Sequence, residues 1–281
     1  RSATRAESIR VCWTDRDRQV IVAGVGCVDD IVGQDEQDFP ARCAQMQERL
    51  PAAFPRMRYY GGCCFDGREP DAAWSAFGAY HFILPRLELV SDPRGCFLCA
   101  NIHLSGDQSH DAVLSGAAPR PQPPRESLPA VRSRTDIPDQ SSWCRHTREC
   151  LAAIARGDYE KIVLARQCQM RLARPADAVT ILQALRRRTA DAYLFAMQFA
   201  PRQAFVGAAP EQLFKRQGKE LWSEALAGTA FPRGQRQRQE VLTSDKQRRE
   251  HQIVVQMIRR VLTPYCQILT NPDQPTVVPL R

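Results

Sequence analysis

The chain has 281 residues, of which 43% are hydrophobic, so it can form one large domain or two ordinary ones. No run approaches 18 uncharged apolar residues and the N-terminal residues lack an apolar signal core, so we expect no membrane association and a cytoplasmic location. The net charge of +8 comes from scattered Lys and Arg without interleaved aromatic residues, which argues against a nucleic-acid partner.

The first part of the chain, residues 1–104, is predicted to be mainly β. Alternating apolar residues predict two strands within 10–22 and further strands at 57–65, 80–90 and 95–104, with one helix at 37–50. Pro85 indicates that the strand at 80–90 lies at an edge or contains a bulge. The strand at 95–104 is expected to pair with the strand at 80–90. Residues 105–140 are rich in Ser, Pro, Arg, Asp and Gly and are predicted to be a linker or surface excursion.

The eleven cysteines are too irregular for a disulfide scaffold, which favours reduced thiols. Cys96 and Cys99, with His103 and His110, have the residue types of zinc ligands. They lie in an alternating run and no second pair of ligands has the usual spacing, so buried strand cysteines are the favoured interpretation.

Residues 141–281 mix helices and strands. Helices are predicted at 141–155, capped by Ser141 and Ser142 and ended by Gly157, at 178–188 and within 239–262, and strands at 161–168, 193–199 and 205–208. The order lacks strict βαβ alternation. It therefore predicts the α+β class, with large, mostly antiparallel sheets and helices packed outside.

The stretch Phe205–Gly234 has the strongest functional pattern. Glu211 follows Pro210 where an apolar strand stops, a charged hairpin comes next, and Gly228 and Thr229 form a turn with backbone N–H groups and a hydroxyl. The Pro210–Glu211 junction and the Gly228–Thr229 turn are expected to form two edges of one pocket. Judged from residue type alone, Lys161 would be a surface lysine, Glu211 a first-turn helix residue and Glu250 a solvent-facing helix residue.

Four motifs together resemble the chorismate-utilising enzymes, and most closely the isochorismate synthases of menaquinone and siderophore pathways. The motifs are Lys161–Arg166 (KIVLAR), Gly207–Glu211 (GAAPE), Glu224–Thr229 (EALAGT) and Glu250–Val255 (EHQIVV). Residues Tyr60–Gly62, Trp74, Phe77 and Leu84–Arg86 also match a pattern of that family. The resemblance covers nearly the whole chain.

The resemblance implies that the substrate is chorismate and that the hydroxyl moves from C4 to C2 to give isochorismate. It assigns Lys161 as the base that deprotonates water and Glu211 as the acid that protonates the departing hydroxyl. Gly228 and Thr229 would bind the ring carboxylate or hydroxyl, and Glu250 would bind Mg²⁺, with no organic cofactor. We expect only a structural role for Glu224.

Several alternatives stay open within the resemblance. Anthranilate synthases usually have Gln in place of Lys161, and aminodeoxychorismate synthases have Lys in place of Ala227, so both departures favour water as the nucleophile. A salicylate synthase and a non-catalytic homologue remain alternatives, and the sequence leaves the oligomeric state open. The family's second metal carboxylate and part of its pocket have no counterpart up to Arg281. We therefore expect a fold that is incomplete at the C-terminus, with residues 141–281 the first part of the catalytic region, and no activity from residues 1–281 alone.

Overall fold

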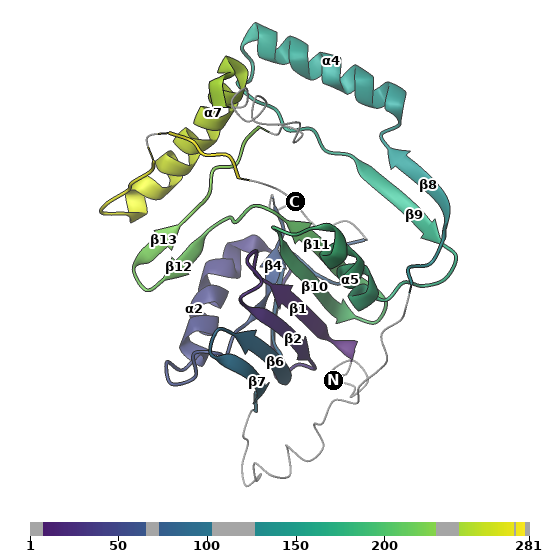
Figure 1. The fold of residues 1–281 in the computed structure, drawn as a ribbon, viewed down its shortest axis with the longest axis vertical. Helices are drawn as coiled ribbons and strands as arrows, with labels where there is room; N and C mark the ends of the chain where they lie inside the picture. The colour runs from purple at the N-terminus through teal and green to yellow at the C-terminus, as the bar shows by residue number, and fades with distance from the viewer. Residues whose placement is uncertain (1–7, 66–72, 103–126, 229–241, 273, 279–281) are drawn as a thin grey trace. The chain divides into compact units, whose positions relative to one another are not determined.

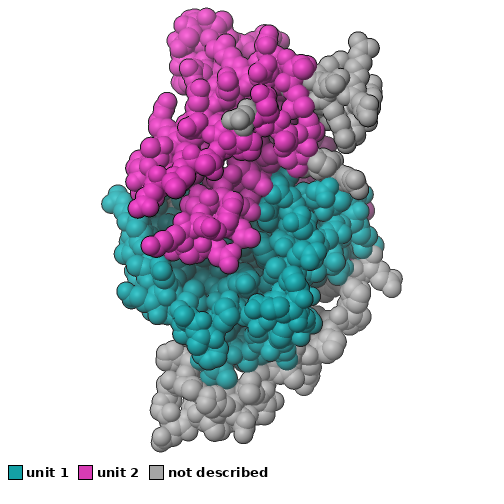
Figure 2. Space-filling view, turned by 60° about the vertical axis from the view of Figure 1, so that its left-hand side comes forward, with its two compact units in different colours: residues 1–128, 176–210, 281 teal, residues 129–175, 211–280 magenta. Residues whose placement is uncertain are grey.

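The structure is a computed structural model that describes residues 8–65, 73–102, 127–228, 242–272 and 274–278. The chain divides into two compact units (Figures 1 and 2). Unit 1 contains residues 1–128, 176–210 and 281, and unit 2 contains residues 129–175 and 211–280. These units differ from the predicted division at 104 and 140, because the chain returns to unit 1 at residues 176–210. Of the predicted linker, 105–126 lie outside the described residues.

Unit 1 contains two antiparallel sheets. The six-stranded sheet has the order β11-β10-β1-β2-β6-β7, and the three-stranded sheet has the order β3-β5-β4. The strands are β1 (Arg10–Thr14), β2 (Ile21–Val25), β3 (Asp29–Gly33), β4 (Tyr60–Cys63), β5 (Tyr80–Leu84), β6 (Leu87–Asp92), β7 (Gly95–Ala100), β10 (Tyr193–Ala200) and β11 (Gln203–Ala209). The predicted α+β class with mostly antiparallel sheets is confirmed.

The single strand predicted at 80–90 is wrong, because the chain breaks at Pro85 into β5 and β6, which belong to different sheets. Proline lacks the N–H that a continuous ladder needs. Its ring packs where β2 carries Gly24, since a β-carbon on that glycine would lie 2.9 Å from the Cβ of Pro85. The predicted pairing of the following strand is confirmed, because β7 pairs with β6.

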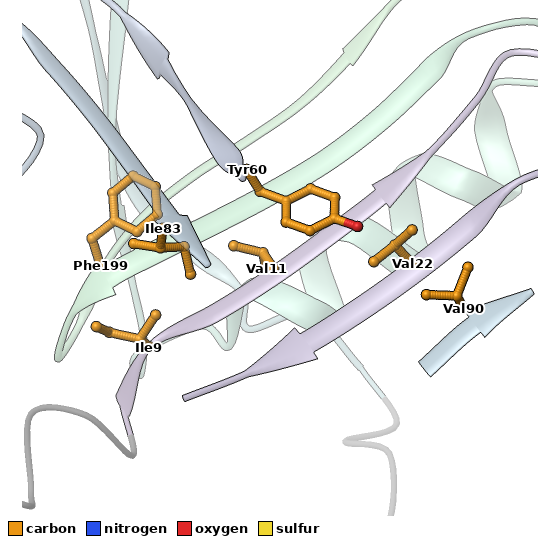
Figure 3. Close-up of a cluster of buried hydrophobic side chains, with 7 residues drawn as sticks. All are labelled: Ile9, Val11, Val22, Tyr60, Ile83, Val90 and Phe199. Atoms are coloured by element: carbon orange, nitrogen blue, oxygen red, sulfur yellow. The ribbon is translucent and has the colours of Figure 1, made fainter. Parts of the chain in front are cut away.

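The core of unit 1 joins residues of both sheets (Figure 3). It consists of Ile9, Val11, Val22, Tyr60, Ile83, Val90 and Phe199. Side chains alternate between the two faces of a strand, and Val11 of β1 and Val22 of β2 lie on the face that points into this cluster. Burial of such apolar surface is the main source of stability for the unit, at roughly 25 cal/mol per Å².

Two helices cover unit 1. The helix α2 (Phe39–Arg49), preceded by the short 3-10 helix η1 (Glu36–Asp38), buries Met46 in a second cluster with Ile31, Ala79 and Tyr80. The helix α5 (Ala178–Arg188) packs on β10 and β11 (Figure 1). Its N-cap is Asp177, whose carboxylate accepts hydrogen bonds from the N–H groups of Val179 and Thr180. The bounds predicted for this helix are confirmed.

A buried polar network links the two sheets of unit 1. The Glu88 carboxylate of β6 is only 1% exposed and accepts hydrogen bonds from the Tyr60 hydroxyl of β4 at 2.8 Å and from Asn101 Nδ2 at 2.6 Å. Asn101 Nδ2 also donates to the Pro85 carbonyl at 2.8 Å. Burial raises the pKa of Glu88, while these donors and the charge of Arg58 act in the opposite direction. The network therefore compensates part of the cost of a carboxylate inside the unit.

Unit 2 contains two helices and two small antiparallel pairs of strands. The elements are β8 (Val131–Ile137), α4 (Gln140–Arg156), β9 (Gln167–Leu172), β12 (Lys215–Gln217), β13 (Glu220–Trp222), α7 (Asp245–Leu262) and the 3-10 helix η2 (Thr263–Tyr265). β8 pairs with β9, and β12 with β13, which confirms the predicted charged hairpin. The strand predicted at 161–168 is wrong, because β9 begins only at Gln167.

The ends of α4 follow local capping rules. The Asp139 carboxylate accepts a hydrogen bond from the Ser142 N–H at 2.8 Å, so Asp139 is the N-cap in place of the predicted Ser141 and Ser142. This bond lowers the pKa of Asp139. Gly157 ends the helix in the left-handed conformation with φ +83°, as predicted.

Few residues of unit 2 are shielded from solvent. Among its described residues only Pro129 is buried, and apolar side chains on both helices are exposed, including Leu151 (61%), Met257 (53%) and Val261 (55%). Local stability follows buried apolar contact. Unit 2 is therefore expected to open more easily than unit 1.

The described residues contain no group of three or more His, Cys, Asp or Glu side chains that could hold a metal ion. Cys96 and Cys99 lie on β7, and the expectation that they are buried is wrong, because Cys96 is exposed and Cys99 is only half-buried. His103 and His110 lie outside the described residues. None of the helices described here has the length and apolar content needed to cross a bilayer.

Glu88→Gln is predicted to change how stability depends on pH. Because burial raises the pKa of Glu88, the folded state holds the proton to higher pH than the unfolded state. The wild type should lose unfolding free energy relative to the variant as pH rises above about 4, the usual range of an unfolded Glu. Chemical denaturation at several pH values measures this difference. A difference that stays flat with pH would contradict the account.

Limited proteolysis should cut described parts of unit 2 before it cuts the strands of unit 1. Candidate positions are the exposed Tyr159, Val163, Tyr265 and Ile268. We expect chymotrypsin to cleave beside Tyr159 or Tyr265 while β1, β2, β5 and β6 stay intact, because cleavage needs local opening. Mass spectrometry of the early fragments identifies the sites, and early cuts within those four strands would refute this order of stability.

Candidate active site

The helix α7 presents three polar side chains on one side. Gln247, Glu250 and His251 are spaced three and four residues apart, which places them on neighbouring positions of the helix surface. Each is half-buried, whereas Arg248 and Arg249 between them are exposed. The predicted helical pattern at 239–262 is thus confirmed over 245–262, and 239–241 lie outside the described residues.

The segment 224–228 contacts this side of α7 at two places. The His251 ring nitrogen Nε2 lies 3.1 Å from the carbonyl oxygen of Ala225, so in the tautomer with a proton on Nε2 it donates to that carbonyl. Gly228 has φ +79°, and a β-carbon built on it would lie 2.2 Å from Gln247 Oε1. Only glycine fits both the backbone conformation and the contact.

Segment 224–228 also contacts Gln212, the residue after Glu211. A Glu224 carboxylate oxygen, Oε2, accepts a hydrogen bond from the Gln212 N–H at 3.2 Å, which fits the structural role expected for Glu224. The Ser223 hydroxyl donates to the Leu213 carbonyl at 2.8 Å. Glu211 itself is exposed at the base of the β12–β13 hairpin. A chain of contacts thus runs from the Glu211 segment through 223–228 to the side of α7 that carries Glu250.

Pro210, the last residue of unit 1 before Glu211, is held from within that unit. Arg16 Nη1 donates to the Pro210 carbonyl at 3.0 Å, and the Arg16 guanidinium lies 5.3 Å from the ring centre of Tyr193. No local pattern predicts this anchor, because 194 residues separate its partners.

Glu250 has the donor chemistry of a magnesium ligand. Its side chain is 37% exposed, and its nearest charged partner is Lys246 Nζ at 4.0 Å, whose own side chain is 79% exposed. Mg²⁺ takes carboxylate oxygens and commonly only one or two from protein, with the remaining positions filled by water and substrate. A single accessible carboxylate therefore fits one position of such a site.

Lys161 is not tied to these residues by any hydrogen bond or ion pair within the described part of the chain. It is half-buried in the irregular segment between α4 and β9. The end of that segment is fixed by Arg166, whose Nη1 lies 2.7 Å from Asp136 Oδ1 of β8. Thr229 lies outside the described residues. The structure therefore brings Gly228 against the helix that carries Glu250 and ties the backbone next to Glu211 to Glu224. It leaves Lys161 a sequence-based candidate.

Gly228→Ala is predicted to destabilise unit 2 by more than the cost of the left-handed backbone alone. Gly157 is a matched control, because its φ of +83° is similar and no atom lies within 4 Å of a β-carbon there. Alanine at Gly157 should cost about 1 kcal/mol, and at Gly228 roughly 1–3 kcal/mol more, since Gln247 has to move. Denaturation followed by hydrogen exchange of α7 measures both, and equal losses would contradict the close contact.

Comparison with known proteins identifies the family. The family model described as "Chorismate binding enzyme" matches residues 1–281. The isochorismate synthase MenF of Bacillus subtilis is 28% identical over 95% of this chain and 62% of its own length. The salicylate biosynthesis isochorismate synthase of Pseudomonas aeruginosa is 30% identical over 89% of this chain and 56% of its own length.

The fold is similar to that of a solved relative. The menaquinone-specific isochorismate synthase MenF of Escherichia coli superposes with a TM-score of 0.76 at 23% identity, covering 100% of this chain and 65% of that one. The chain therefore spans somewhat less than two thirds of the length of these relatives. With the family match over residues 1–281, these likenesses show that the chain belongs to the chorismate-binding enzymes.

Proposed function

We propose that this chain carries part of the active site of an isochorismate synthase, with chorismate as its substrate. The observation that supports this most is the contact between the Gly228 turn and the side of α7 that carries Glu250. It joins two of the four motifs on which the family resemblance depends. The named relatives, isochorismate synthases from three bacteria, support the same reaction.

The proposed reaction exchanges one hydroxyl for another. The oxygen of water forms a bond to C2 of the ring, the two ring double bonds shift, and the bond between C4 and its oxygen breaks. One water is consumed and one is released. Lys161 takes the proton of the attacking water, and Glu211 gives a proton to the departing hydroxyl. Backbone N–H groups at Gly228 and the Thr229 hydroxyl are suited to hold the ring carboxylate or hydroxyl.

Glu250 would hold Mg²⁺, which supplies positive charge to a substrate that is a dianion. The accessible carboxylate and the flexible Lys246 beside it support this assignment. Chorismate contains two carboxylates, so a divalent cation and the net charge of +8 both favour its binding. No organic cofactor is needed for this chemistry.

Lys161→Ala and Glu211→Gln are predicted to slow turnover strongly while leaving the fold intact. We expect kcat to fall by roughly 10²- to 10⁴-fold in the natural protein that contains this chain, because each change removes a proton-transfer group. Lys219→Ala and Glu220→Gln are matched controls at exposed positions and should keep wild-type turnover.

Product analysis with chorismate as substrate accompanies these rate measurements. Isochorismate as the only product supports the proposal, whereas accumulation of salicylate would identify a salicylate synthase instead. Retention of turnover by both variants would show that Lys161 and Glu211 are not the base and the acid.

A further inference from the structure

The strand β3 of unit 1 has an open pocket along one edge. The pocket has a volume of about 230 Å³ and is lined by four consecutive residues of β3, 29–32, and by Arg42, Gln45 and Arg49 of α2. Consecutive side chains of a strand point to opposite faces, so a space that borders all four residues lies at the edge of the strand. The edge of β3 is therefore accessible from solvent.

This edge offers backbone groups for pairing. Among the described strands of unit 1, β3 pairs with β5, and β5 lies between β3 and β4. A strand at the edge of a sheet has N–H and C=O groups that point away from its partner. Such groups bind another extended backbone, which adds a strand to the sheet.

The charged side chains of the pocket already have partners. The Asp29 carboxylate accepts hydrogen bonds from Arg49 and from the Tyr59 hydroxyl. Arg42 Nε lies 3.1 Å from Asp38 Oδ2. Because each arginine is neutralised by an aspartate, the pocket does not select a small anion. The strand edge, which favours an extended chain, decides the kind of partner.

The sequence around β3 restricts how it can pair with a copy of itself. When a two-fold axis relates two antiparallel strands, one residue lies opposite its own copy. An axis at Asp29 or Asp30 sets a carboxylate against the same carboxylate, and an axis at Val32 sets Asp29 against Asp35. Like charges that lie directly opposite each other destabilise a pair of strands. These three registers are therefore unfavourable.

An axis at Ile31 removes this conflict. Ile31 is the central residue of β3, so all five residues of the strand then pair. Asp29 lies opposite Gly33 of the second copy, and Asp30 lies opposite Val32. No two charges of the same sign are opposite each other. This register combines the largest number of paired residues with the least repulsion.

The helix α2 brings charge that suits the same register. Arg49 contacts Asp29 at the start of β3, and Met46 packs with Ile31 at its centre. Arg42, one further turn back along α2, therefore lies toward the end of β3. In the register centred on Ile31, Asp29 of the second copy arrives at that end. An arginine of one copy thus faces an aspartate of the other.

We propose that β3 pairs with β3 of a second copy of this chain, antiparallel and centred on Ile31, and so forms a homodimer. The pairing gives one continuous sheet with three strands from each copy. A two-fold contact uses the same surface on both copies, so association stops at the dimer. This inference concerns unit 1 and does not depend on the proposed reaction.

Sedimentation velocity over a series of concentrations measures the dimer dissociation constant of the natural protein that contains this chain. Val32 is 44% exposed, so charged substitutions there are compatible with the folded monomer. Val32→Glu should weaken the dimer roughly tenfold, because it sets a carboxylate against Asp30 at two symmetry-related positions. Val32→Lys sets opposite charges there and should stay within about threefold of wild type.

The control is Leu98→Glu, at a 65% exposed position of β7 in the other sheet, which should leave the dissociation constant unchanged. Melting temperatures show whether each variant is folded. Hydrogen exchange of the wild type gives a test without a variant. The backbone amides of β3 should exchange more slowly at concentrations at which the dimer forms.

Four results would overturn the inference. They are a wild type that sediments as a monomer at every concentration, a dimer that Val32→Glu leaves unchanged, equal weakening by Val32→Glu and Val32→Lys, and exchange of the β3 amides that does not depend on concentration. Each of them leaves the proposed reaction untouched, because turnover of chorismate is measured separately.

Discussion

Gly228 lies against the Gln247 side chain with no room for a β-carbon, and the rest of the candidate site depends on this contact. It holds segment 224–228 beside α7 together with the His251 contact to the Ala225 carbonyl. The Glu224 carboxylate then fixes the backbone next to Glu211. Glycine suits this position because the backbone is left-handed and any larger residue would require the Gln247 side chain to move.

The two units contribute differently to the protein. Unit 1 has a continuous apolar core between two sheets and compensates its buried Glu88 with two hydrogen bonds. Unit 2 carries Lys161, Glu211, Gly228 and Glu250, yet among its described residues only Pro129 is buried. Elements that bind ligands commonly have low local stability. In unit 2, side-chain contacts to backbone groups hold the candidate site in place of an extensive core.

Much of the local structure could be predicted from the sequence, because it depends on short-range signals. Asp177 and the apolar spacing that follows it define α5, and Gly157 ends α4. Errors arose where long-range packing decides. Pro85 sends β5 and β6 to different sheets, and the apolar run after Lys161 stays irregular although its composition favours a strand. The site residues came from the resemblance of four motifs to a known family, which carried no signal for the contact between Gly228 and Gln247, nineteen residues apart.

The central claim is that this site adds water to chorismate and releases the original hydroxyl. Incubation of the natural protein that contains this chain with chorismate and Mg²⁺ in oxygen-18 water, followed by mass spectrometry, tests it directly. The account predicts isochorismate that carries one oxygen-18 atom in its C2 hydroxyl. Unlabelled isochorismate, or no isochorismate at all, would contradict it.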